Sequence, residues 1–139
     1  MRAQVSVEFL VIMGMILVLM IPVIIYAFSI INIESQEKID ISKAKVSVDR
    51  LAYTVDSVGS AGTGSILYTE IFVSRVDNVT IHPEGEIEFG IETSNGNLDI
   101  YKKTQYKLTF DPNMQNIKSG NYKVLISATN SSHVFLGLA

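Results

Sequence analysis

The sequence contains no cysteine, only two histidines and a modest excess of acidic over basic residues. Without cysteine there is no disulfide, so an extracellular domain made from this chain must be held together by its core or by its neighbours. The 11 basic and 14 acidic residues give a formal net charge of −3. This balance does not provide the clustered basic face that nucleic acids require, and no nucleic-acid partner is predicted.

Motifs for catalysis and for metal binding are also lacking. His82 and His133 are 51 positions apart, with no His-x-x-x-His pair and no His-Glu doublet, so neither a zinc site nor any other cofactor is predicted. Both histidines are expected at the surface or at strand ends. The glycines of residues 59–64 follow a predicted helix instead of preceding one, which is the wrong order for a phosphate-binding loop. We do not expect an enzyme.

An acidic group of side chains has two interpretations. It offers oxygen ligands for a cation, but a solvated strand face that discourages edge pairing is the preferred explanation. Its members are Glu70, Glu84, Glu86, Glu88 and Glu92.

The longest feature is an apolar run, Phe9 to Ile33, with 25 consecutive residues that carry no charge. As a helix it would span about 37 Å, more than the roughly 30 Å of a bilayer's hydrocarbon core. It exceeds the apolar core of a secretory signal peptide, and no small-x-small cleavage site follows it. Arg2 before the run and Glu34 after it favour a cytoplasmic N-terminus with the rest outside. Within the run, Gly14 and Pro22 predict a kink.

Residues 34–58 carry a second helical pattern. Apolar residues recur there at spacings of 3, 4, 3, 4 and 3, which places them on one helical face: Ile41, Ala44, Val48, Leu51, Val55 and Val58. No Gly or Pro separates this stripe from the end of the apolar run, so one helix is predicted from about residue 5 to 58. The glycine-rich residues 59–65 are predicted to end it and to form a linker.

After the linker the apolar residues alternate with a period of 2, which is typical of half-buried strands. Seven strands are predicted in residues 66–139, with a hairpin turn at Ser94-Asn95-Gly96-Asn97. Their approximate limits are 66–74, 78–82, 86–92, 97–102, 105–110, 122–129 and 133–138. The predicted fold is α+β, in which the outer part of a long N-terminal helix packs against a small antiparallel β-sandwich-like head, giving a lollipop shape. The triplets beginning at Asn78 and Asn130 are possible N-glycosylation sites.

The first residues resemble a known signal. Residues 2–12, Arg-Ala-Gln-Val-Ser-Val-Glu-Phe-Leu-Val-Ile, are similar to the class III signal peptide of archaeal type IV pilins. That pattern has a basic and a small residue before Gln-x-Ser-x-Glu, here Gln4, Ser6 and Glu8, with Ile12 where leucine is usual. The resemblance implies that a prepilin peptidase cuts between Ala3 and Gln4, leaving a leader of residues 1–3 and a membrane or filament-core helix of residues 4–33.

The same resemblance implies a function. The chain would be a structural subunit of an archaeal type IV pilus-like surface filament for adhesion, assembled from copies of itself by the pilus assembly machinery. It would lie in the cell membrane before assembly and in an extracellular filament afterwards. Glu8 would pair with the terminal amine of an adjacent subunit or engage that machinery. A minor pilin, an archaellin-like subunit and a single-span membrane protein presenting an extracellular binding domain are the alternatives.

Overall fold

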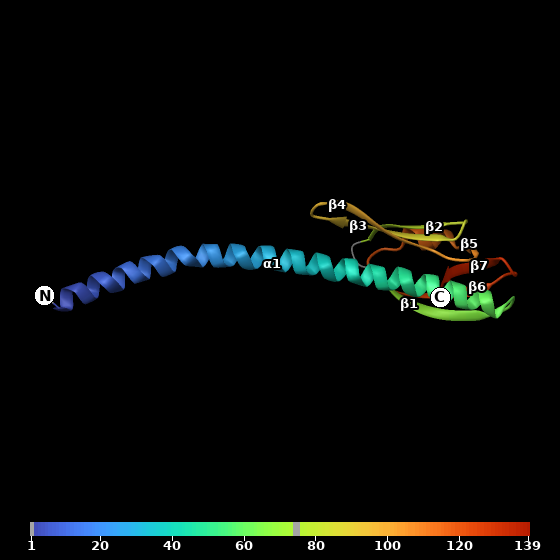
Figure 1. Cartoon of the computed structure of the whole chain (residues 1–139), viewed down its shortest axis with the longest axis horizontal. Helices are drawn as coiled ribbons and strands as arrows, with labels where there is room; N and C mark the ends of the chain where they lie inside the picture. Colours follow the sequence, from blue (N-terminus) through green and yellow to red (C-terminus); the bar gives the residue numbers. More distant parts are fainter. Residues whose placement is uncertain (1, 74–75) are drawn as a thin grey trace. The chain divides into compact units, whose positions relative to one another are not determined.

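The computed structural model describes the backbone of residues 2–73 and 76–139, and the side chains of residues 7–73 and 78–139. The chain forms two compact units, Met1–Lys38 and Ile39–Ala139. One helix, α1 (Arg2–Ala61), supplies the whole described part of the first unit and continues into the second (Figure 1). Although Pro22 lacks a backbone N–H, α1 continues through it and through Gly14 without a break.

The second unit contains two small sheets and one short 3₁₀ helix, η1 (Pro112–Asn116), which lies between the predicted strands of residues 105–110 and 122–129. The sheets have the strand orders β1-β6-β7-β5 and β2-β3-β4. The strands are β1 (Ile66–Val73), β2 (Val76–His82), β3 (Glu86–Thr93), β4 (Gly96–Lys103), β5 (Lys107–Phe110), β6 (Gly120–Ala128) and β7 (His133–Leu138). The predicted strands are therefore confirmed to within a few residues at each end, and the chain is α+β.

The strand directions differ from the prediction in one place. All pairs are antiparallel except β5 and β7, which run parallel in the register Lys107↔His133 to Phe110↔Leu136. Between them the chain passes through η1 and β6 before it returns as β7 beside β5. A period of 2 indicates which face of a strand is buried, but it carries no information on the strand's neighbour or direction.

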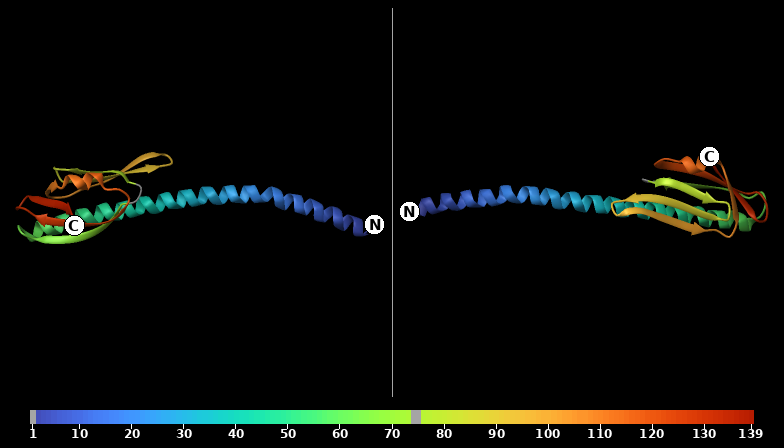
Figure 2. Two further views of the ribbon diagram at one scale, coloured as in Figure 1. Left: turned by 180° about the vertical axis from the view of Figure 1, so that it is seen from behind. Right: turned by 90° about the horizontal axis from the view of Figure 1, so that it is seen from above.

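The core of the second unit forms around the predicted helical stripe. Ala44, Val48, Leu51, Val55 and Val58 are fully buried, and Ile41 is half-buried. The helix bearing them lies between the two sheets (Figures 1 and 2). Both sheets turn alternate side chains toward it. These side chains form one cluster with the helix: Ile71, Val73, Val79, Ile81, Ile87, Phe89, Ile91, Leu108, Val124, Ile126, Val134 and Leu136. The helix thus occupies the space in which a simple sandwich would pack sheet on sheet.

Side chains of α1 also satisfy the free edge of β1. Ser47 Oγ donates to the carbonyl oxygen of Phe72 at 2.8 Å and accepts from the Phe72 N–H at 3.1 Å. The Arg50 guanidinium donates to the carbonyl oxygen of Glu70 at 3.2 Å. An edge strand otherwise presents these groups to any passing strand. The helix therefore closes this edge with hydrogen bonds as well as covering its apolar face.

Helix α1 ends at Ala61 instead of Val58, so the glycine segment is shorter than the predicted linker of residues 59–65. Gly59 is a buried helical residue facing the ring of Tyr106. Gly62 and Gly64 then adopt left-handed φ values of 95° and 90°, which favour glycine. Gly64 N–H donates to the carbonyl oxygen of Ala128 at 3.0 Å, so the segment is anchored to β6.

Candidate functional site

The apolar part of α1 has no cover of its own. Every residue from 7 to 36 is exposed in the single chain. Even large apolar side chains are exposed on all sides of the helix: Leu19 is 72% exposed, Tyr26 69% and Phe28 62%. By length and composition the helix is able to cross a membrane, because an 18-residue stretch of it has a mean hydropathy of 2.9. Such a surface is unfavourable in water and requires lipid or other protein chains around it.

Glu8 lies at the start of this apolar surface. Because α1 begins at Arg2, Glu8 falls in the second helical turn, and the first turn contains no acidic residue. The positive end of the helix dipole compensates a carboxylate best in the first turn, so Glu8 lies just beyond the position of strongest compensation. Its side chain is exposed, and among the described side chains it has no hydrogen bond or ion pair.

The other residues of the proposed signal lie close by on the same helix. The backbone of Ala3, Gln4 and Ser6 is helical, but their side chains lie outside those that the structure describes. Ile12 is 56% exposed and belongs to the uncovered apolar surface. Gly14 has open space where a Cβ would stand, so no contact within the chain requires a glycine there.

The two possible glycosylation sites are both exposed and lie on the second unit. Asn78 is in β2. Asn130 lies in the turn before β7, where its Oδ1 accepts from the N–H groups of Ser132 and His133 at 2.9 and 2.8 Å. The Asn130 side chain thus has a structural role in shaping this turn, whether or not it is modified.

The acidic residues do not form a single group. Glu70 is on β1, whereas Glu86, Glu88 and Glu92 are on β3 of the other sheet. The histidines lie at strand ends, as predicted: His133 begins β7, and His82 ends β2 beside Glu86 and Glu88. The sequence patterns did not predict the group of His82, Glu86 and Glu88. The signal for it is the short connection through Pro83, Glu84 and Gly85, which places His82 opposite Glu86.

We compared the chain with family models, with curated proteins and with solved structures. No family model, no curated protein and no solved structure matches it.

Proposed function

We propose that this chain is a structural subunit of a surface filament of the archaeal type IV pilus kind, in which the apolar part of α1 forms the filament core. The observation that carries the proposal is the combination of a long helix, uncovered on all sides over residues 7–36, with one carboxylate at its N-terminal end. The resemblance of residues 2–12 to a class III signal peptide supports the same assignment.

Burial of the helix stabilises the assembled filament where it stands in water. Covering one large apolar side chain contributes about 1.5–3 kcal/mol, and the helix offers many, among them Leu10, Leu17 and Ile25, each more than 60% exposed. The same surface is stable in lipid, so the precursor waits in the membrane and then exchanges lipid for neighbouring helices.

Glu8 distinguishes assembly from simple anchoring. A carboxylate at the edge of lipid costs less than the roughly 2.5–3.5 kcal/mol of the bilayer centre, but it remains unfavourable until a cation meets it. Cutting the chain between Ala3 and Gln4 would create a new amine only four residues before Glu8. An amine at that depth on an adjacent subunit is the partner that the proposal assigns to Glu8.

The first test is mass spectrometry of the protein purified from its native membranes and from sheared surface filaments. We expect a mature chain that begins at Gln4 in the filament fraction. A chain that retains Arg2 and occurs only in the membrane fraction would contradict the proposal and support a single-span protein that presents its β domain.

The second test is substitution of Glu8. We expect Glu8→Ala to abolish or strongly reduce filaments in electron micrographs while the precursor still reaches the membrane. Glu34→Ala is the matched control, because it removes a carboxylate from the opposite end of the apolar run and should leave filaments intact. Normal filament numbers in the Glu8→Ala cells would show that this carboxylate has no part in assembly.

A further inference from the structure

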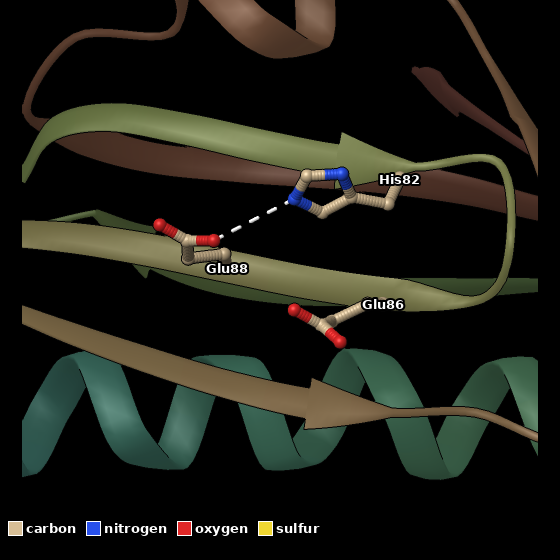
Figure 3. Close-up of side chains that lie close together, drawn as sticks. All are labelled: His82, Glu86 and Glu88. Atoms are coloured by element: carbon tan, nitrogen blue, oxygen red, sulfur yellow. Dashed lines mark ion pairs between the residues drawn. The ribbon is translucent and has the colours of Figure 1, made fainter.

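Three side chains that can bind a metal ion meet on the outer face of the β2–β3 hairpin: His82, Glu86 and Glu88 (Figure 3). His82 pairs with Glu86 across the two strands. Glu88 is two residues further along β3, so it projects from the same face of the sheet. The apolar neighbours Ile81 and Ile87 point the other way, into the core. Strand register alone therefore brings one imidazole and two carboxylates together.

The distances are close to those of a coordinated ion. His82 Nε2 and Glu88 Oε2 are 3.5 Å apart, and one ligand atom from each of the three residues lies within 4.8 Å of the others. Metal–ligand bonds of about 2.0–2.2 Å place neighbouring ligand atoms about 3.0–3.6 Å apart. The first pair already has this separation, and a small rotation of the Glu86 side chain would bring the third ligand atom closer.

The backbone that carries these ligands is firmly held. The turn between His82 and Glu86 contains Gly85 at a φ of 101°. Its carbonyl oxygen accepts from the N–H and the hydroxyl of buried Thr104, at 2.7 and 2.9 Å. The carbonyl oxygen of Pro83 accepts from the Leu108 N–H at 2.9 Å. A ligand set on such a backbone needs little reorganisation when an ion enters.

The surroundings leave the site accessible. The side chains of His82 and Glu88 are 45% and 26% exposed, which admits an ion and its remaining water ligands. Glu86, like Glu8, takes part in no hydrogen bond or ion pair among the described side chains. The residue opposite Glu86 in the β3–β4 register is Lys103, which is exposed.

We propose that His82, Glu86 and Glu88 form a binding site for one divalent transition-metal ion of the Zn²⁺ type. The imidazole nitrogen favours zinc or a neighbouring transition metal over Mg²⁺ and Ca²⁺, which prefer sets made only of oxygen. Three protein ligands leave at least one coordination position for water or for a donor group of another molecule. The alternative is an exposed His82–Glu88 ion pair, which contributes little to stability and binds no metal.

The test is calorimetric titration of Zn²⁺ into the full chain in detergent micelles, after treatment with a chelator. We expect saturable binding of one Zn²⁺ per chain. His82→Gln and Glu88→Gln should each weaken it by about tenfold or more, since even residues that only orient a metal ligand contribute 10–100-fold. Mg²⁺ in equal concentration should not displace the Zn²⁺.

The chain provides matched controls for both residue types. His133→Gln removes the other histidine, and Glu92→Gln removes a carboxylate from the same strand, two alternating positions beyond Glu88. Both variants should bind Zn²⁺ like the unsubstituted chain. In that unsubstituted chain, the NMR signals of the His82 imidazole should shift on addition of Zn²⁺, while those of His133 stay unchanged.

Several results would overturn the proposal. They are the absence of saturable binding, unchanged affinity in His82→Gln, equal losses in the two control variants, and displacement by Mg²⁺ at equal concentration. The NMR measurement needs no substitution, so it decides the question even where a variant fails to fold.

Discussion

Ser47 forms hydrogen bonds with the backbone of β1 that a neighbouring strand would otherwise form. Its hydroxyl serves both the N–H and the carbonyl oxygen of Phe72, while the serine itself is only 4% exposed. One short side chain thereby satisfies two backbone groups at a sheet edge that is not paired with any further strand of the described residues. Such groups are costly when they lose their partners away from water.

Ser47→Ala is therefore expected to destabilise the β domain by about 1–3 kcal/mol, because it leaves both Phe72 groups without their partner. Denaturant unfolding of the full chain in detergent, followed by circular dichroism of the β structure, measures the change. Ser42→Ala is the control, since Ser42 is an exposed serine on the same helix, and its effect should stay within about 0.5 kcal/mol. Equal losses in the two variants would mean that the edge hydrogen bonds contribute nothing particular.

At the scale of elements, the C-terminal end of α1 packs closely on the rest of the domain where Gly59 meets the ring of Tyr106. A Cβ at Gly59 would overlap the ring of Tyr106 in the connection between β4 and β5. One turn earlier, the Asp56 carboxylate accepts from the N–H of Gln105 at 2.8 Å. The last turns of the helix are thus fastened to this connection, and glycine is what allows the contact.

Gly59→Ala should consequently be destabilising, although the same change inside a helix usually stabilises by about 0.5–1 kcal/mol. The overlap with Tyr106 should instead cost about 1–3 kcal/mol. A double-mutant cycle checks the cause by thermal unfolding: in a Tyr106→Ala background, Gly59→Ala should become neutral or stabilising. If the alanine destabilises equally in both backgrounds, the ring is not the reason for the glycine.

Local patterns predicted the elements well, and the failures have a common origin. The strand β3 and the buried stripe of α1 were predictable, because the spacing of apolar residues within a short stretch of sequence shows a period of 2 or of 3.6. The parallel pairing of β5 with β7 and the contact of Ser47 with Phe72 join distant segments, so no local pattern contains them. The pairing of His82 with Glu86 is intermediate between a local pattern and a distant contact, because only a short turn separates the two residues.

At the scale of the whole molecule, α1 has two surfaces with different partners. Over residues 7–36 it is exposed on every side, whereas from Ala44 to Val58 its apolar stripe is buried within the β domain. A single chain buries the apolar stripe from Ala44 to Val58, but it leaves the apolar surface of residues 7–36 exposed. Substitution of the same residue type in the two parts should therefore have separable effects.

Leu51→Ala and Leu17→Ala are the matched pair, because Leu51 is fully buried and Leu17 is 64% exposed in the single chain. Leu51→Ala should lower the free energy of unfolding of the β domain in detergent by about 2–5 kcal/mol, through lost burial and the cavity left behind. Leu17→Ala should change that quantity by no more than about 0.5 kcal/mol.

The substitution Leu17→Ala should instead lower the stability of assembled filaments. Each subunit there would bury this side chain against its neighbours, so Leu17→Ala filaments should dissociate at a lower temperature than unsubstituted filaments, with the β domain still folded after dissociation. Light scattering and circular dichroism on the same sample distinguish the two events. Because every subunit of a filament repeats the substitution, a small loss per chain is multiplied along the core. Unchanged dissociation of the Leu17→Ala filaments would place that face of the helix outside the subunit contacts.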